Sequence, residues 1–236
     1  SLPLAFLTLY FRRYMQETPE FEKEKTKNIK QYSFSKIFWD KKNLFLAVVL
    51  LYGAIGGTYH LTLVFLKTFI PTVFKGENYS LWSGLNILFF VVLALSMIAS
   101  GLLSRGGKQK SLRVIGRGLL LAFFGVCLLI FSLTFESHLF AAASIITIIV
   151  GLSPLNCLAH YLVHDLFPVQ IRYRALSLSH NLGSMLLSGP APLLATALYR
   201  KTALTISPAL MLLVLLIQAF IFTSWLKKAK PLDLNI

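Results

Sequence analysis

The chain has 236 residues, of which 56% are hydrophobic and 14% are charged, against roughly 25% charged residues in soluble domains. A formal net charge of +14 would suit a nucleic-acid-binding protein. Such a protein carries its basic residues on a soluble module, interleaved with aromatic side chains, and no such module is visible in this sequence. The composition therefore excludes an ordinary soluble domain and favours a membrane protein.

Six apolar segments follow one another with little polar sequence between them. A hydrocarbon core of about 30 Å takes roughly 20 residues of helix to cross, and backbone polar groups inside it must be bonded within the segment. We therefore predict an all-α integral membrane protein, a bundle of six transmembrane helices connected up and down. The predicted spans are Leu44–Ile70, Leu81–Leu103, Gly118–Thr134, Leu139–Val163, Ala175–Tyr199 and Ala203–Leu226.

The basic residues lie mainly on one side of the predicted bundle. Of the 23 Lys and Arg, 19 fall in the segment before the first span, in the loops after the second and fourth spans, or in the tail. The remaining four are Lys67, Lys75, Arg200 and Lys201. This is the positive-inside pattern, which predicts that both ends of this chain are cytoplasmic. The basic excess is thus a topology signal, and no nucleic-acid partner is predicted.

The chain divides into four predicted parts. Ser1–Phe11 is apolar but too short to span, so we interpret it as the end of a preceding transmembrane helix in a longer protein. Residues 12–43 form a cytoplasmic linker, residues 44–226 hold the six spans, and residues 227–236 form a cytoplasmic tail. In the linker, Phe34, Ile37 and Phe38 alternate with lysines. That pattern fits either a short amphipathic helix on the membrane surface or a disordered linker.

Nothing in the sequence points to a metal, a cofactor or a catalytic centre. Cys127 and Cys157 both fall inside predicted spans, where small core residues are expected rather than a disulfide or a metal pair. No cluster with metal-ligand spacing and no nucleophile–base pair stands out. We predict no cofactor, no metal and no enzyme activity.

Three stretches carry a resemblance to a known family. Arg12–Phe21 resembles the pattern R-R-x-x-x-E-T-P-x-F that follows the sixth helix of metabolite:proton symporters in the major facilitator superfamily, a group that includes the bacterial proline/betaine transporters. Gly101–Lys108 resembles the superfamily loop pattern G-x-L-S-D-R-x-G-R without its Asp. Asp165–Ala175 is similar to E-L-F-P-T-R-I-R-Y-x-A, and Asn181 and Gly189–Leu193 continue the match.

This resemblance covers essentially the whole chain. It implies the carboxy-terminal half of a twelve-helix transporter, in which the six predicted spans are helices seven to twelve. It also implies the partners: a small-molecule solute, protons, the lipid bilayer and the amino-terminal half that completes the cavity. A multi-pass protein of a bacterial inner membrane is expected.

The gate at the cytoplasmic mouth is predicted from one acidic residue. Asp165 is the only acid in the two cytoplasmic loops after the second and fourth spans, and it lies among Arg105, Lys108, Arg172 and Arg174. A transporter needs contacts that form in only one of its states. We predict that Asp165 and Arg172 latch the closed mouth, with Arg105 and Arg174 as further gate residues. The alternative is ordinary positive-inside charge, which accounts for Lys108.

Polar side chains within spans are costly and face a cavity or another helix. Helices seven, eight, ten and eleven line the cavity in the superfamily that this chain resembles, so polar residues on the corresponding spans are predicted to face solute. The cavity candidates are Tyr52, His60, Asn86, Asn156, His160 and Asn181.

His60 and the fifth span each add a specific expectation. His60 shares a stripe with three glycines. It either binds solute or protons, because imidazole changes charge near neutral pH, or it is a neutral ring bonded to a neighbouring helix. The Gly189–Pro192 stretch predicts a kinked or broken helix, because proline cannot continue the hydrogen-bond ladder. Interrupted helices often mark transport sites.

The predicted function is proton-coupled uptake of a small polar metabolite or osmolyte such as proline or betaine. All nine acids lie in loops or tails, so the proton carrier is expected in the amino-terminal half, or at His60 or His160. One alternative is a dicarboxylate or tricarboxylate symporter of the same family, disfavoured because no Lys or Arg lies deep in a predicted span. Another is a non-transporting, degenerate half-transporter that acts as a membrane sensor or assembly partner.

Overall fold

The structure is a computed structural model that describes residues 6–11, 42–74 and 79–228. Within these residues, six helices are long and apolar enough to cross a membrane, which confirms the predicted all-α architecture. Residues 6–11 form a short helix. Linker residues 12–41, with the amphipathic segment predicted around Phe34, and tail residues 229–236 lie outside the described part of the chain.

Four of the six spans are continuous helices and two are interrupted. In the first span, a π-helical segment (η1) joins two α-helices, and the fifth span contains a second such segment (η2). The elements are α4 (Lys42–Tyr59), η1 (His60–Phe65), α5 (Leu66–Val73), α6 (Tyr79–Leu103), α7 (Lys108–Thr134), α8 (His138–His164), α9 (Val169–Gly183), η2 (Ser184–Ser188), α10 (Ala191–Thr202) and α11 (Ser207–Lys228).

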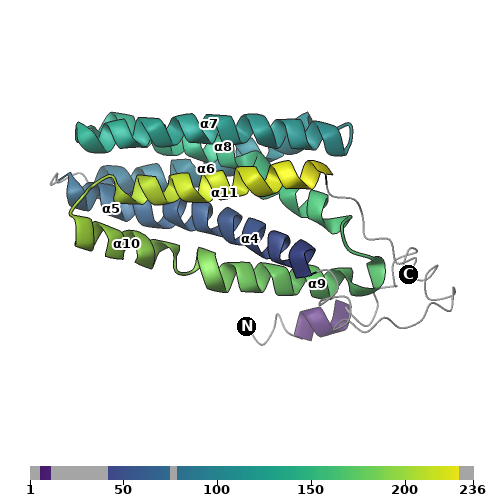
Figure 1. The fold of residues 1–236 in the computed structure, drawn as a ribbon. Helices are drawn as coiled ribbons and strands as arrows, with labels where there is room; N and C mark the ends of the chain where they lie inside the picture. The colour runs from purple at the N-terminus through teal and green to yellow at the C-terminus, as the bar shows by residue number, and fades with distance from the viewer. Residues whose placement is uncertain (1–5, 12–41, 75–78, 229–236) are drawn as a thin grey trace, which may run out of the picture.

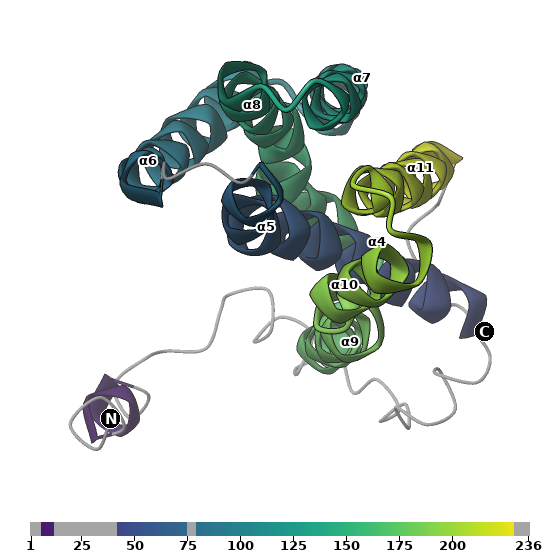
Figure 2. The same cartoon turned by 90° about the vertical axis from the view of Figure 1, so that its left-hand side faces the viewer.

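Neighbouring spans run antiparallel because the connections between them are short. We call the end of the bundle that holds loops 104–107 and 165–168 the basic end; loops 135–137 and 203–206 lie at the other end. Figure 1 shows α4 between α11 and α9, and α4 contacts both of these helices as well as α8. In the end-on view of Figure 2, α6, α8 and α7 lie on one side of the first span, and α9 and α10 lie on another.

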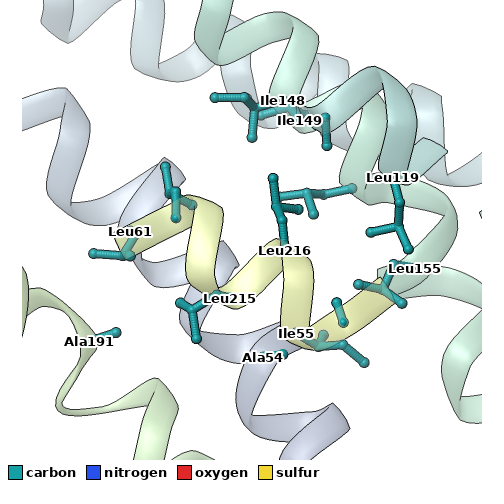
Figure 3. Packing of buried hydrophobic residues seen from close by; sticks show 14 of the residues in the cluster. Ala54, Ile55, Leu61, Leu119, Ile148, Ile149, Leu155, Ala191, Leu215 and Leu216 are labelled. Atoms are coloured by element: carbon teal, nitrogen blue, oxygen red, sulfur yellow. The ribbon is translucent and has the colours of Figure 1, made fainter. Parts of the chain in front are cut away.

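The core of the bundle is one apolar cluster to which several spans contribute side chains. In Figure 3, Leu216 of α11 lies among side chains that include Ile55 of α4, Leu119 of α7 and Leu155 of α8, and all four are buried. Lipid tails are as apolar as leucine, so helix association in a membrane depends on close packing rather than on escape from water. These contacts therefore decide how the spans sit against one another, not whether they insert.

The closest approach between α7 and α8 runs through glycines. A Cβ atom added at Gly118 of α7 would lie 2.5 Å from the carbonyl oxygen of Gly151 on α8, and one at Gly125 would lie 2.9 Å from the backbone nitrogen of Ile148. Real side chains do not fit at such distances, so the two backbones touch only because these positions lack a Cβ.

Two helices extend beyond the predicted spans. The helix of the third span begins at Lys108, not at Gly118, so the basic residues from Lys108 to Arg117 lie in the first turns of α7. The sequence boundary followed apolar content, whereas helical hydrogen bonding continues through charged residues. The predicted loop Arg200–Thr202 is the end of α10; the turn comes later, at Ala203, whose φ of 55° ends the helix in the left-handed region.

One cysteine prediction is also wrong. Cys127 is exposed on α7, whereas Cys157 of α8 is partly buried. A helix at the margin of a bundle packs only one face against its neighbours, and Cys127 lies on another face of α7.

The predicted interruption at Gly189–Pro192 is confirmed. The segment η2 ends at Ser188, α10 begins at Ala191, and Gly189 and Pro190 form a turn between them. The segment η1 in the first span, which starts at His60, was not predicted. Single π-helical turns inside α-helices occur frequently at functional sites.

Candidate functional site

Three ring side chains from three different spans meet within the bundle. Tyr52 of α4 lies with its ring centroid 5.0 Å from that of His160 on α8 and 5.3 Å from that of His180 on α9. The two imidazole centroids are 6.2 Å apart. We call Tyr52, His160 and His180 the ring cluster. It unites two predicted cavity residues with a histidine that the sequence analysis missed.

One ring of the cluster is buried and the other two are exposed. Tyr52 is only 3% exposed, whereas His160 and His180 are both exposed. The two imidazoles thus leave one side uncovered by the described part of the chain, next to the aromatic face of Tyr52.

Glycines beside the ring cluster hold its helices in register. A Cβ atom at Gly183 of α9 would lie 2.7 Å from the backbone nitrogen of Gly53 on α4, and one at Gly53 would lie 2.5 Å from Leu187 Cδ1. Gly53 follows Tyr52 directly, and Gly183 lies one turn beyond His180. This backbone contact therefore sets the separation between the rings of Tyr52 and His180.

The remaining polar candidates on α8 and α9 lie near the cluster in sequence. Asn156 is one turn from His160, and its Nδ2 donates to the carbonyl oxygen of Leu152 in its own helix at 3.0 Å. Asn181 follows His180 and is exposed on α9. Their predicted contact with solute stays a prediction.

His60 links the two interrupted spans. Its Nδ1 lies 3.1 Å from the carbonyl oxygen of Ser188 and 3.0 Å from the Ser188 hydroxyl. The ring donates to the carbonyl in one tautomer and accepts from the hydroxyl in the other. The contact fits the second of the two interpretations of His60, a ring bonded to a neighbouring helix, and it joins η1 to the end of η2.

Asn86 bonds to a cation near one end of the first span. Lys67 Nζ donates to Asn86 Oδ1 at 3.3 Å, which connects α5 to α6. The helix continues past Lys67 to Val73, and the lysine is partly buried. Lys67 therefore belongs to the first span, toward the end opposite the basic end. Because Lys67 lies near the end of this span, it does not overturn the expectation that no Lys or Arg lies deep in a predicted span.

At the basic end, a histidine contacts two of the predicted gate residues. Asp165 Oδ1 accepts from His164 Nδ1 at 3.2 Å, and His164 Nε2 lies 3.4 Å from a terminal nitrogen of Arg172. Arg172 Nε also donates to the carbonyl oxygen of Phe167 at 3.0 Å. His164 thus stands between Asp165 and Arg172 in this conformation, and the predicted latch between these two residues stays a prediction. Arg105 and Arg174 are exposed, and their gate role stays a prediction.

His180 and His164 were missed although a sequence signal existed for both. An ionisable residue within a transmembrane segment is a functional hypothesis by default, and both lie in or at the end of a predicted span. What no pattern within one helix could supply was the partner, because each ring bonds or packs against residues of another element.

Comparisons with known proteins agree with this architecture. A family model described as Major Facilitator Superfamily matches residues 1–192. The proline/betaine transporter of Salmonella typhimurium (strain LT2) is 25% identical to the chain over 91% of it, and that of Escherichia coli (strain K12) is 24% identical over 94%. No solved structure matches the chain significantly.

The chain spans about half the length of the curated relatives that it matches. It covers 44% of the Salmonella typhimurium protein and 45% of the Escherichia coli protein. The six described spans therefore correspond to part of a larger helical transporter in these relatives.

Proposed function

Because the chain belongs to the Major Facilitator Superfamily, we propose that the protein containing it couples solute uptake to proton influx by alternating access. In this proposal, the chain supplies one six-helix half and an amino-terminal half completes the cavity. The charge distribution supports a cytoplasmic location for both ends of the chain. The bacterial relatives support a bacterial inner membrane.

The proposed solute is a zwitterion with a cationic nitrogen and a carboxylate, such as proline or betaine. The observation that carries this proposal is the ring cluster. An aromatic face attracts a cation, including a quaternary ammonium, and a protonated imidazole forms charge-assisted hydrogen bonds with a carboxylate. Tyr52, together with a protonated His160 or His180, offers a partner to each end of such a solute. The names of the relatives support the same class of solute.

Proton and solute are coupled in this proposal through the charge of one imidazole. A proton binds to one ring of the pair, because a second charge would stand within the 6.2 Å separation of the ring centroids. The charged ring then binds the carboxylate of the solute. When the mouth opens to the cytoplasm, the proton leaves, the carboxylate loses its partner and the solute dissociates. Each ligand therefore raises the affinity for the other, as linkage requires.

The interrupted spans supply the movement in this proposal. The segments η1 and η2 break the regular ladder of the two helices that carry Tyr52 and His180. Helices that are discontinuous near a binding site are a recurring feature of secondary transporters. The bond between His60 and Ser188 sits at this joint and is proposed to hold it in the present conformation.

One observation favours a second candidate, a symporter for dicarboxylates or tricarboxylates. Lys67 is a partly buried cation within the first span, bonded to Asn86. A solute with two or three carboxylates needs more positive charge than the ring cluster offers, and Lys67 is a further cation about 22 Å along the same span from Tyr52.

Uptake by the whole protein in proteoliposomes tests the proposal. Labelled proline, betaine and 2-oxoglutarate are offered with and without an inward proton gradient. We expect uptake of a zwitterion, stimulated by the gradient. Uptake of 2-oxoglutarate alone would select the second candidate, and uptake that ignores the gradient would refute proton coupling. If no solute is taken up by protein that retains its fold, the non-transporting alternative is favoured.

A further inference from the structure

A groove of about 390 Å³ lies between α6, α7 and α8 toward the basic end, apart from the ring cluster. Its basic lining comes from one helix: Lys110, Arg113 and Arg117 of α7. All three side chains are exposed. We call this feature the basic groove.

The three cations form a single stripe along α7. Their positions differ by three and four residues, a spacing that stacks side chains on one face of a helix. The positive-inside rule asks only for basic residues near the cytoplasmic boundary. It does not require them to share one face, nor that face to line a groove. The arrangement therefore calls for a ligand-based explanation.

The depth of the stripe matches the headgroup region of a bilayer. With 27 residues, α7 is about 40 Å long, which exceeds a hydrocarbon core of about 30 Å. The apolar part, residues 118–134, accounts for roughly 25 Å of that length. Arg117 then lies at the hydrocarbon boundary, and Lys110 and Arg113 lie among the headgroups.

The wall of the groove changes from basic to apolar along its length. Beyond the cations, Leu121 of α7, Val150 of α8 and Leu103 of α6 also line it. Two serines of α6 contribute hydroxyls, Ser96 and Ser100. Within the described part of the chain, no carboxylate lines the groove. It thus offers positive charge at headgroup level next to apolar surface deeper in the membrane.

We propose that the basic groove binds an anionic phospholipid of the leaflet at the basic end. The headgroup phosphate contacts Lys110, Arg113 and Arg117, and an acyl chain lies along the apolar wall. Basic pockets between transmembrane helices bind phosphate headgroups in this way. Charge complementarity and the order of polar and apolar lining together select a lipid rather than a small anion. This site is independent of the proposed solute and its coupling ion.

The test is native mass spectrometry of the whole protein after delipidation, with phosphatidylglycerol or phosphatidylcholine of identical acyl chains added back. We expect the protein to retain phosphatidylglycerol selectively. The double variant R113Q/R117Q should lower the binding constant for phosphatidylglycerol on the order of tenfold, because each cation near the surface contributes to attraction of anionic lipid. Binding of phosphatidylcholine should change little.

Two further variants separate the groove from charge in general. K227Q/K228Q removes the same charge from the end of α11, outside the groove, and should keep the preference. Ala99→Trp leaves every charge in place but fills the groove from α6, and should weaken phosphatidylglycerol binding. An R113Q/R117Q protein with wild-type preference would overturn the proposal. Equal losses of phosphatidylglycerol binding in R113Q/R117Q and K227Q/K228Q would also overturn it.

Discussion

Two interfaces in this bundle are packed through glycines, yet one joins continuous helices and the other joins interrupted ones. Between α7 and α8, Gly118, Gly125 and Gly151 bring together two continuous helices of 27 residues each. Between the first and fifth spans, Gly53 and Gly183 produce an equally close approach, but both spans are interrupted by π-helical segments. Close packing through glycines therefore occurs both between continuous helices and between interrupted ones.

The polar chemistry follows the interrupted interface. His60 bonds to Ser188 across it, and Tyr52 and His180 of the ring cluster come from its two sides. A helix without a change of hydrogen-bond pattern keeps one regular geometry along its length. A π-helical segment leaves a local irregularity that can shift. We infer that the α7–α8 pair serves as the frame and that the first and fifth spans carry the moving site.

The largest effect is expected from the ring cluster. The variant H160Q/H180Q should reduce proton-driven betaine uptake about a hundredfold, since hydrogen bonds to charged groups contribute roughly 1.5–3 kcal/mol each. The thermal midpoint should change little, because both imidazoles are exposed. His138→Gln is the control: that ring accepts from Trp82 Nε1 at 3.2 Å near the other end of the bundle. Similar losses in the control would remove the ring cluster from the transport site.

Replacing a glycine by alanine should have different effects at the α7–α8 interface and at the interface between the first and fifth spans. Gly151→Ala places a Cβ against the backbone of Ala122 and should lower the free energy of unfolding by about 1–3 kcal/mol, measured by thermal denaturation in detergent. Gly183→Ala should cost less stability, because the neighbouring π-helical segment can shift, but should reduce uptake more. Gly116→Ala on α7 meets no atom within 4 Å and serves as the control. Equal stability losses at Gly151 and Gly183 would contradict the distinction.

A smaller effect is expected at the joint between the two π-helical segments. Ser188→Ala removes the hydroxyl contact with His60 but leaves the carbonyl contact, so the loss should stay near 0.5–1 kcal/mol. Hydrogen exchange should nevertheless increase around residues 60–65 and 184–188. The exposed Ser177→Ala on α9 provides the comparison. Unchanged exchange at both segments would show that this bond does not restrain the joint.

The smallest effect on stability is expected at the basic end. Asp165→Asn keeps an acceptor for His164 but removes the charge, and both side chains are more than half exposed, at 59% and 51%. Exposed ion pairs contribute about 1 kcal/mol or less. A gate role would still shift the balance between inward-open and outward-open forms, so labelling of single cysteines in the cavity should change. Labelling identical to that of the unchanged protein would refute the latch.

Much of the frame could be predicted from local sequence. A run of apolar residues long enough for the bilayer leaves the backbone no alternative to a helix, so all six spans were found. The break at Gly189–Pro192 was also predictable, because proline acts on its own helix. Span ends were less predictable: Lys108 and Arg117 are helical although charged, since hydrogen bonding along a helix does not stop where hydropathy falls.

The site required the tertiary structure. Tyr52 and His160 stood out as polar groups in spans, but their meeting with His180 depends on how α4, α8 and α9 rotate and slide against one another. That geometry comes from close contacts such as Gly53 with Gly183, which join residues distant in the chain. His164 entered between Asp165 and Arg172 for the same reason. Sequence alone therefore determined the solvent, the helices and the family resemblance, because these depend on residues near one another in the chain. Only packing between helices decided which side chains share a site.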